Sequence, residues 1–483
     1  MKINSVEKYR PALHFSPKSN WMNDPNGLVY FKGEYHLFYQ HNPNDSVWGP
    51  MHWGHAVSKD LITWNELDIA LFPDELGTIF SGSAVIDWNN TSGLFPEGDP
   101  GIVAIFTHHL DRGQELPPVQ TQSLAFSTDQ GRTWKKYDGN PVLKHQTKID
   151  FRDPKVFWHE QTNKWIMSLA TGQSISFYSS PNLIDWNFES EFGEDIGSHV
   201  GVWECPDLFE LTIENSNDKK WVLFVSVGDN GKTEHGSRTQ YFIGSFDGSS
   251  FKPDNTETKW LDFGKDNYAG VSFSDIPMED GRRIYLSWMT NWRYANQVPT
   301  DGWRGQMSLP RELTLRKVNE DLLVVQKPVR ELTSYFQIRE EISDLPIKSE
   351  HRFELNESYA DVELTIDNTD AKSYGLKIYH TEDQYSIISI DTVTSTLTLD
   401  RSNSGEIDFS DMFSLPQSLT LNGTEKINLR IIMDSSSLEV LVNDGELSLT
   451  SLVYPDKTCE SISLFTTNGQ VNVIQGKIKV PSV

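Results

Sequence analysis

The sequence predicts an all-β protein in which a five-bladed β-propeller is followed by a C-terminal β-sandwich. Three observations lead to this fold class. A turn motif recurs in the first half, short apolar runs separate its copies, and all 15 tryptophans lie between Trp21 and Trp303. We therefore expect a propeller over residues 1–325, a linker over 326–345 that could include a short helix, and a sandwich over 346–483.

The recurring motif is typical of the end of one strand, a turn and the start of the next. A serine-led turn with Asp or Asn follows the strand, and an aromatic residue opens the next one. The copies occupy residues 57–64, 126–134 and 178–186, with a weaker copy at 244–251. The apolar runs between them, such as 102–106 and 221–225, are too short for helices. A repeat of several strands indicates blades, here longer than the usual period of about 40–50 residues.

Five positions mark where the first strand of each blade begins. They are Asp24, Ser81-Gly82-Ser83, Asp153, Glu204 and Tyr268-Ala269. Each precedes an apolar pair of strands, and successive positions are about one blade apart. If the first strand of every blade is innermost, side chains at the same end of these strands converge on the central channel. Residues far apart in the sequence would then meet in space.

The second half of the chain alternates apolar and polar residues. The segments 361–366, 396–400 and 437–445 show this pattern, and the last ends in an Asn-Asp-Gly turn. Short strands with one polar face predict a β-sandwich. No motif with evident chemistry lies in this half.

Composition excludes several classes of protein. The net charge of −26 and the pI of about 4.9 argue against binding to nucleic acid or to an anionic membrane surface. Two cysteines, Cys205 and Cys459, do not make a disulfide framework. The histidine pairs 52/55 and 108/109 lack the spacing of zinc ligands on one face of a strand. We expect no metal and no cofactor.

The ends and surface of the chain give only coarse expectations. No apolar run approaches the ~18 residues that span a membrane, and residues 1–10 lack the apolar core of a signal peptide. As it stands, the sequence predicts a cytoplasmic protein, and a secreted one if a signal has been removed. The oligomeric state is open, with a homodimer as one possibility.

Three acidic motifs share one design. Residues 21–27, 151–155 and 203–207 each hold a carboxylate one or two positions before a proline and close to an aromatic residue. Burial near apolar rings disfavours the charged form of a carboxylate and is costly. Three such placements indicate one pocket in which carboxylates do chemistry.

Glycoside hydrolysis fits this pattern, because it needs one carboxylic acid that donates a proton and one ionised carboxylate. Sugars also dock on aromatic rings and hydrogen-bond to polar side chains. The candidate rings are Trp21, Trp48, Trp53, Phe80, Trp203 and Trp303, and the candidate hydrogen-bonding groups are Asn23, Gln40, Arg152 and Asp153.

Each carboxylate also has a simpler interpretation. Asp24 lies in Asn-Asp-Pro-Asn-Gly, which is an ordinary turn sequence. Asp153 could form a local ion pair with Arg152, and Asp207 could belong to a turn or support the site from behind. Glu204 between a tryptophan and a cysteine is harder to explain as solvated surface.

These motifs resemble glycoside hydrolase family 32, which contains invertases, levanases, exo-inulinases and sucrose-6-phosphate hydrolases. The matching segments are WMNDPNGLVYFKGEYHLFYQHNP (21–43), FSGSAV (80–85), FRDPKVF (151–157) and WECPDLF (203–209). The resemblance implies the fold predicted above. It also implies that Asp24 is the nucleophile, that Glu204 is the general acid and base, and that Asp153 stabilises the transition state.

The resemblance further implies a retaining hydrolase that releases terminal β-D-fructofuranosyl units from levan or inulin and also splits sucrose. The substrate-binding residues would be Trp21, Asn23, Gln40, Trp48, Phe80, Ser81, Arg152 and Trp303. The segments 81–95 and 291–300 look like those of levanases and exo-inulinases. Residues 301–304 depart from them, with Asp-Gly-Trp-Arg where many levanases have Ser-Pro-Trp-Arg, so exo or endo action stays open.

Three alternatives remain at this stage. The first is an intracellular invertase or sucrose-6-phosphate hydrolase, which a phosphate-binding cluster of Lys and Arg at the pocket mouth would favour. A non-catalytic fructan-binding protein would not need all three acids. A fructosyltransferase would differ in how the site excludes water from the fructosyl-enzyme.

Overall fold

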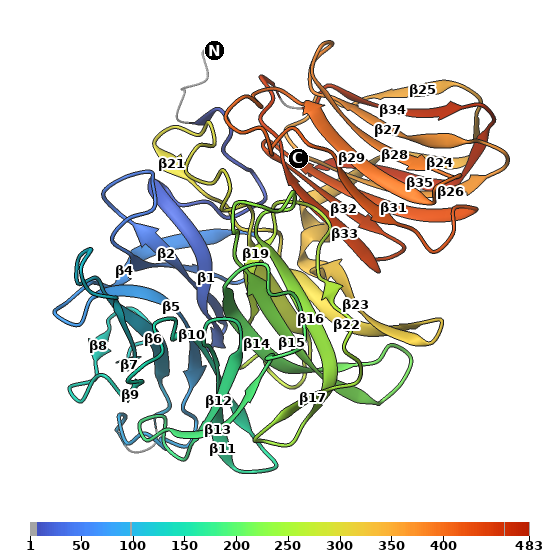
Figure 1. The fold of residues 1–483 in the computed structure, drawn as a ribbon. Helices are drawn as coiled ribbons and strands as arrows, with labels where there is room; N and C mark the ends of the chain where they lie inside the picture. The colour runs from blue at the N-terminus through green and yellow to red at the C-terminus, as the bar shows by residue number, and fades with distance from the viewer. Residues whose placement is uncertain (1–6, 97–98, 458, 483) are drawn as a thin grey trace.

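The computed structural model describes residues 7–96, 99–457 and 459–482 and is built almost entirely of strands (Figure 1). Five sheets of four or five strands surround a common centre, and two sheets of six strands pack beside them. The predicted fold class, a five-bladed propeller followed by a sandwich, is therefore confirmed.

Each blade is an antiparallel sheet whose strands follow one another outward. Blade one contains β1 (Asn20–Phe31), β2 (Glu34–Asn42), β3 (His52–Ser58) and β4 (Trp64–Leu71), and blade two contains β5 (Thr78–Ile86), β6 (Ile102–Leu110), β7 (Val119–Ser127), β8 (Lys135–Lys136) and β9 (Leu143–Lys144). Blade three contains β10 (Arg152–His159), β11 (Lys164–Ala170), β12 (Ile175–Ser180) and β13 (Asn187–Phe192). Blade four contains β14 (Trp203–Thr212), β15 (Lys219–Val227), β16 (Arg238–Phe246), β17 (Phe251–Pro253) and β18 (Lys259–Trp260). Blade five contains β19 (Tyr268–Ser272), β20 (Arg283–Trp288), β22 (Arg311–Val318) and β23 (Asp321–Pro328).

The first strands of the five blades form the inner ring. β1 contacts β5 and β19, and β10 contacts β5 and β14, while β14 also contacts β19. The short strand β21 (Trp303–Arg304), which follows β20 in the chain, pairs in parallel with the start of β1. A segment from blade five thereby joins the sheet of blade one.

The recurring turn motif lies between the third and fourth strands of the blades. Its serine accepts a backbone hydrogen bond, as Ser58 Oγ does from Leu61 N at 2.8 Å. The tryptophan that opens the fourth strand then donates its indole N–H to the carbonyl three residues earlier, from Trp64 to Leu61 O at 3.0 Å. The copies at Trp134 and Trp186 make the same bond. The same closed turn therefore recurs at the rim of the first three blades.

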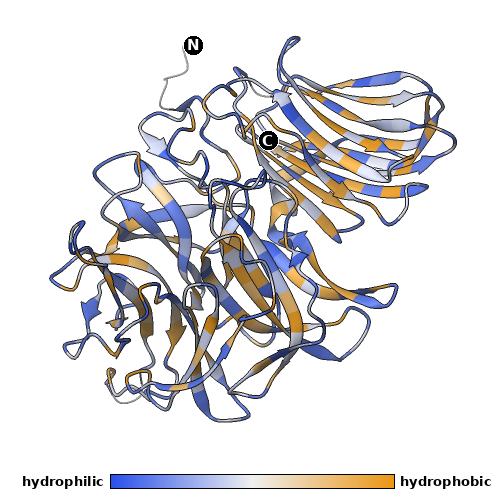
Figure 2. Ribbon diagram, in the orientation of Figure 1, coloured by the Kyte–Doolittle hydropathy of each residue, from blue (hydrophilic) through white to orange (hydrophobic). Residues whose placement is uncertain are grey.

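The sandwich consists of two antiparallel sheets. One is ordered β24 (Phe336–Ile347), β35 (Val471–Pro481), β26 (Ala360–Asn368), β31 (Lys426–Asp434), β32 (Ser437–Val442) and β33 (Leu447–Leu452). The other is ordered β25 (Glu350–Glu354), β34 (Ser461–Thr467), β27 (Ser373–Tyr379), β28 (Tyr385–Asp391), β29 (Thr396–Asn403) and β30 (Gln417–Thr420). Apolar and polar residues alternate along these strands (Figure 2). One face of each sheet is therefore buried in a shared core, as in Val362, Leu364 and Ile366 of β26.

The connection between the domains differs from the expected linker. Strand β23 of blade five continues to Pro328, and β24 of the sandwich begins at Phe336. Between them lies one 3₁₀ helix, η2 (Arg330–Tyr335). Strands occupy most of the range 326–345 because the polar residues there lie on exposed strand faces rather than in a flexible segment.

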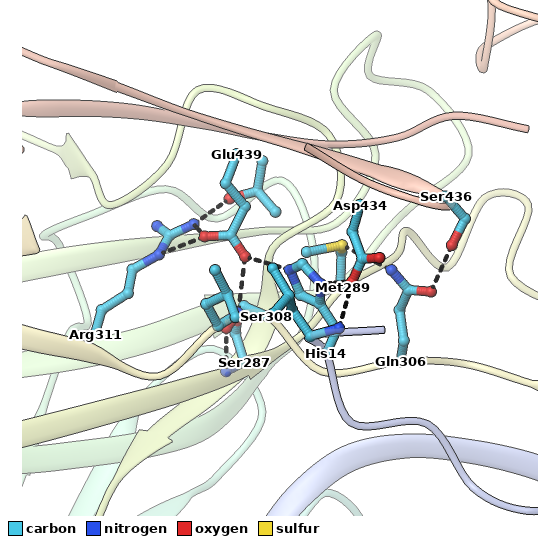
Figure 3. Close-up of polar contacts among 12 residues, drawn as sticks. His14, Ser287, Met289, Gln306, Ser308, Arg311, Asp434, Ser436 and Glu439 are labelled. Carbon is cyan, nitrogen blue, oxygen red and sulfur yellow. Dashed lines mark hydrogen bonds and ion pairs between the residues drawn. The ribbon is translucent and has the colours of Figure 1, made fainter. Parts of the chain in front are cut away.

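A buried set of charged groups joins the two domains. This domain junction consists of His14, Arg311, Asp434 and Glu439 (Figure 3). His14 lies between the two acids, with Nδ1 2.8 Å from Asp434 Oδ2 and Nε2 3.0 Å from Glu439 Oε1. The Arg311 guanidinium donates to Glu439 Oε2 at 2.7 Å. All four side chains are fully or almost fully buried, so the junction satisfies its charges internally.

Within the described part of the chain, no helix has the length and apolarity to cross a membrane.

Candidate active site

Each inner strand carries a β-bulge near its start, and the three predicted carboxylates lie at these bulges. The pairing register shifts between Met22 and Pro25 in β1, Ile79 and Gly82 in β5, Arg152 and Lys155 in β10, Glu204 and Asp207 in β14, and Tyr268 and Val271 in β19. A bulge bends the strand and redirects a side chain. Asp153, Cys205 and Ala269 at these bulges have positive φ values of 63°, 46° and 54°. The repeated bulge therefore turns side chains from all five blades toward one end of the channel.

Asp24 is held by three neutral donors. The Asn23 amide donates to Oδ1 at 2.9 Å, and the Ser81 hydroxyl donates to Oδ2 at 2.7 Å. The Cys205 thiol lies 3.4 Å from the same Oδ2. Burial raises the pKa of Asp24, the negative charge of Glu204 raises it further, and the three hydrogen bonds lower it. The site thus holds Asp24 by hydrogen bonds, with no cation as its direct partner among the described residues.

Asp153 is the most deeply buried of the three carboxylates. Its Oδ2 accepts the Cys205 backbone N–H at 3.0 Å and lies 4.0 Å from the Arg152 guanidinium. Burial raises the pKa of Asp153 to about 7, with the charges of Glu204 and Asp24 acting in the same direction and Arg152 opposing them. Asp153 therefore lies close to two other acids, with the Arg152 guanidinium as its cationic neighbour.

Glu204 keeps 22% of its side chain accessible, against 6% for Asp153. Its Oε1 accepts hydrogen bonds from Arg152 Nε at 3.3 Å and Nη2 at 3.1 Å. Its Oε2 accepts the Tyr268 hydroxyl, which comes from blade five. Glu204 is thus fixed in direction by two donors while still reaching solvent, which suits a group that exchanges protons.

The pocket around these acids has a volume of about 210 Å³. It is lined by Asn23, Asp24, Gln40, Trp48, Phe80, Ser81, Arg152, Asp153, Glu204 and Trp292. The structure therefore brings together the three predicted catalytic acids and six of the eight predicted binding residues. Trp292 was not among the predicted residues, although it lies in the segment 291–300 that resembles levanases and exo-inulinases, because that resemblance assigned no role to single residues.

Two predicted binding residues, Trp21 and Trp303, do not line the pocket. The Trp21 ring is fully buried against Trp288 and Trp292, and its indole N–H donates to Asn23 Oδ1 at 2.7 Å. Trp21 therefore orients Asn23 instead of facing a ligand. Trp303 is 1% exposed, with the Arg10 guanidinium 4.7 Å from its ring. Both rings are thus packed among other side chains in this structure, and their part in substrate binding stays a prediction.

Two further candidate rings are buried in the same way. Trp53 is buried and donates its indole N–H to the Phe80 carbonyl at 3.0 Å. Trp203 is buried and donates to the Ser198 carbonyl at 2.7 Å. The Trp53 bond holds the backbone at Phe80, and Trp203 directly precedes Glu204 in β14; Phe80 and Glu204 both line the pocket.

The pocket wall and rim contain the remaining aromatic and amide groups. Trp48 is 46% exposed, and its ring meets Phe80 edge to face with centroids 6.3 Å apart. Phe80 in turn stacks on His109 at 4.2 Å. The buried Gln40 donates to Asn26 Oδ1 at 2.8 Å and to the Ile79 carbonyl at 3.0 Å. These contacts hold Phe80 and Gln40 in the pocket wall, and the exposed ring of Trp48 lies at the mouth.

Asp207 supports the site from beneath. Its Oδ2 accepts the backbone N–H of Ser272 at 2.6 Å and its hydroxyl at 2.8 Å, and Lys155 Nζ lies 3.6 Å away. These contacts tie β14 to β19 and β10. Of the two interpretations left open, the supporting role fits this geometry.

The segment 291–300 is anchored by an ion pair. Arg293 Nε and Nη2 donate to the two carboxylate oxygens of Asp229 at 2.6 and 2.7 Å. This pair joins the loops after β20 and β15 beside Trp292. Among the described residues, no group of three or more His, Cys, Asp or Glu side chains is arranged to hold a metal ion.

Comparison with known proteins gives the family. The profile of the glycosyl hydrolases family 32 N-terminal domain matches residues 14–328, and that of the family 32 C terminal matches residues 330–480. The chain therefore belongs to glycosyl hydrolase family 32, and it is a glycoside hydrolase of the β-fructosidase type.

Individual proteins agree with this assignment. A levanase from Bacillus subtilis is 49% identical over 97% of this chain and 69% of its own length. The crystal structure of an exo-inulinase from Aspergillus awamori superposes with a TM-score of 0.92 at 33% identity and covers 99% of both chains. A fructofuranosidase from Schwanniomyces occidentalis in complex with fructosylnystose gives a TM-score of 0.91 at 33% identity, over 100% of this chain and 99% of its own.

Proposed function

We propose that this enzyme releases terminal β-D-fructofuranosyl units from levan- and inulin-type fructans, splits sucrose as well, and retains the configuration at the anomeric carbon. One observation carries the proposal. Asp24, Asp153 and Glu204, from three different blades, line the same pocket of about 210 Å³ behind an aromatic rim. The levanase and exo-inulinase relatives support the choice of fructans.

In the first step, Asp24 attacks the anomeric C2 of the fructosyl unit. The bond from C2 to the glycosidic oxygen breaks, and that oxygen takes the proton of the Glu204 carboxylic acid. Asp24 suits the attack because neutral donors orient it and no cation competes for its charge. The products are a fructosyl ester on Asp24 and the shortened chain or glucose.

In the second step, water cleaves the ester. Glu204, now a carboxylate, takes a proton from the water, and the resulting oxygen attacks C2 as the bond to Asp24 breaks. Two displacements on opposite faces of C2 give net retention. Asp153 binds fructose hydroxyls and stabilises the positive charge that develops on the ring in each transition state.

The size of the pocket supports release of single terminal units. Sites for drug-sized ligands usually hold roughly 300–1,000 Å³, whereas this pocket holds about 210 Å³. It fits one sugar unit rather than the interior of a chain. Trp48 at the mouth offers an exposed ring to the next unit.

The lining argues against a phosphorylated substrate. Arg152 is the one cationic side chain among the described residues that line the pocket. It already donates to Glu204 and Asp150. A sucrose-6-phosphate hydrolase would need a further cation for the phosphate, so the proposed substrates are neutral fructosides.

We also propose that the enzyme acts outside the cell. Fructan polymers are too large to enter a cell intact, and the Aspergillus relatives are named extracellular exo-inulinases. The check is fractionation of the producing cells, with activity expected in the medium. Activity confined to the cell interior would contradict this proposal.

Product analysis tests the substrate assignment. Ion chromatography of early products from levan, inulin, sucrose and sucrose-6-phosphate should show free fructose alone from the polymers, with glucose in addition from sucrose. A ladder of oligosaccharides at early times would mean endo action. Faster turnover of sucrose-6-phosphate than of the other three would favour the phosphate alternative.

A further inference from the structure

A second cavity lies at the opposite mouth of the propeller channel. The inner strands begin at the active site, and their far ends line this cavity of about 670 Å³. On β14, Glu204 faces the active site, while Asp207 to Glu210 line the second cavity. Six residues of strand separate Glu204 from Glu210, which corresponds to about 20 Å. The cavity is therefore separate from the catalytic pocket.

Aromatic rings and charged groups together line this cavity. The rings that line it are Trp88, Phe157, Trp158, Trp165, Phe209 and Trp221. The carboxylates are Asp87, Glu160, Asp207, Glu210 and Asp275, and the cations are Lys155 and Arg283. Asn89 and Asn163 add amides. Apolar faces with hydrogen-bonding groups between them match a sugar, whose ring faces carry C–H groups and whose edges carry hydroxyls.

Two lining groups have unused hydrogen-bonding capacity. Asp207 is 1% exposed, and its Oδ1 is buried without a hydrogen-bond partner in the described chain. Arg283 makes only long hydrogen bonds, both 3.4 Å, to Ser272 Oγ and the Phe273 carbonyl. No carboxylate of the described residues forms an ion pair with it. A buried acceptor and an unpaired guanidinium are costly unless something else binds them.

Trp88 is the most prominent ring at the cavity edge. It is 56% exposed, which is unusual for so large an apolar side chain. Its orientation is nevertheless fixed, because the indole N–H donates to Asp275 Oδ1 at 2.8 Å and the ring meets Phe31 edge to face at 5.9 Å. An exposed ring held in one position is a preorganised binding surface.

The charges decide the class of ligand. Five carboxylates against two cations disfavour an anionic ligand such as a sugar phosphate. The described acids do not form a cluster suited to a metal ion either. A neutral polyhydroxylated ligand can use acceptors, donors and rings together.

We propose that this cavity is a second saccharide-binding site, which binds a neutral oligosaccharide of fructose units without cleaving it. The choice of fructose units rests on the proposed function, whereas the lining alone points to a saccharide. A polymer bound there would keep the enzyme on its substrate and raise the local concentration of chain ends at the active site.

The test counts binding sites in a chain that cannot turn over. In the Glu204→Gln variant, calorimetric titration with a short inulin-type oligosaccharide should give two sites per chain. Adding Trp88→Ala should remove the second site or weaken it about tenfold. Adding Phe188→Ala to Glu204→Gln instead should leave both binding sites unchanged, because Phe188 is 57% exposed on β13 and does not line the cavity. Glu210→Gln serves as a second cavity variant, should Trp88→Ala fail to fold.

Kinetics supply an independent readout. In the otherwise unchanged enzyme, Trp88→Ala should raise the KM for levan or inulin polymer by about tenfold and leave kcat and the KM for sucrose unchanged. A single site in Glu204→Gln, or two sites that neither Trp88→Ala nor Glu210→Gln affects, would overturn the proposal. Failure of the unmodified enzyme to hydrolyse any fructoside would instead contradict the proposed function, since the site count does not depend on turnover.

Discussion

The catalytic pocket and the domain junction both bury acidic side chains, but the two regions differ in how many basic partners these acids have. In the pocket, the Arg152 guanidinium pairs with Asp153 and Glu204 but not with Asp24, and the pKa of Asp153 rises to about 7. At the junction, two acids have two basic partners. His14 and Arg311 compensate Asp434 and Glu439, the pKa of Asp434 falls, and that of Glu439 falls to about 2.

This difference in basic partners distinguishes a reactive site from a structural one. Burial alone would raise the pKa of every one of these acids. Partners reverse the effect for Asp434 and Glu439, whereas the pKa values of Asp24 and Asp153 stay raised. A buried acid without a full complement of partners costs stability, and such groups mark reactive sites. Variants that change one region at a time should separate the two, from the largest expected effect to the smallest.

The largest effect should come from the two acids that take part in bond breaking. Asp24→Asn and Glu204→Gln should each lower kcat on sucrose by about 10⁴-fold or more, because each removes a covalent or proton-transfer role. Thermal unfolding of both variants should stay close to that of the parent. Near-normal activity in either would show that its role is wrongly assigned.

The junction should show the reverse pattern. Glu439→Gln removes one buried negative charge and leaves Asp434 as the partner of His14 and Asp262, 3.3 Å away, as the partner of Arg311. It should therefore lower the free energy of unfolding by about 3–5 kcal/mol. The kcat of the folded variant should be almost unchanged. Chemical denaturation and kinetics at low temperature measure the two quantities.

A matched control for the junction is the exposed pair of Lys8 and Asp456, 2.9 Å apart. Asp456→Asn should cost less than about 1 kcal/mol, because surface ion pairs contribute little. A loss as large as that of Glu439→Gln would show that burial is not what distinguishes the junction.

The two regions should also respond to pH in different windows. The pKa of His14 rises from its ordinary 6.5 to about 9, because two acids hold its protonated form. Its contribution to stability is therefore complete below pH 6.5 and lost as the pH rises through about 9. The loss should be roughly 3 kcal/mol, at about 1.4 kcal/mol for each pKa unit. A His14→Gln variant should lack this decline.

Asp153 should also make stability fall as the pH rises, but within a lower pH window. Its pKa rises from 3.8 to about 7, so the neutral form is favoured in the folded state and stability is lost as the pH rises from about 4 to 7. Asp153→Asn should be more stable than the parent at pH 8 and close to it at pH 4. Equal stability of the two proteins at both pH values would contradict the crowding of acids in the pocket.

The smallest effect should come from a group that only orients a catalytic acid. Ser81→Ala removes the 2.7 Å hydrogen bond to Asp24, which should lower kcat by roughly tenfold. The hydrogen bond lowers the pKa of Asp24. The acidic limb of the pH–rate profile should therefore move to higher pH. Ser83→Ala on the same strand, which does not line the pocket, should leave the profile in place.

Much of the fold and of the pocket followed from local sequence. The serine-led turns predicted the blades because the same closed turn joins the third and fourth strands of the first three blades. The acids before prolines predicted the pocket because each lies at a bulge of an inner strand. Nine of the eleven predicted site residues line the pocket. Their roles in the reaction stay predictions.

What the sequence did not predict depends on contacts between distant segments. Trp21 and Trp303 have the right residue type, but which face a ring presents is set by its neighbours on other strands. Tyr268 was recognised only as the start of a blade, since its bond to Glu204 crosses from blade five to blade four. His14 meets Glu439 across 425 positions, and no local pattern signals such a pair.

The central claim is that Asp24 forms a covalent bond to the sugar and Glu204 moves the proton. The direct test is mass spectrometry of Glu204→Gln, quenched during reaction with a fructoside whose leaving group needs no proton. Our account predicts that the chain gains one fructosyl unit and that peptide mapping locates it on Asp24. Turnover of that substrate with no adduct, or an adduct on a different residue, would contradict it.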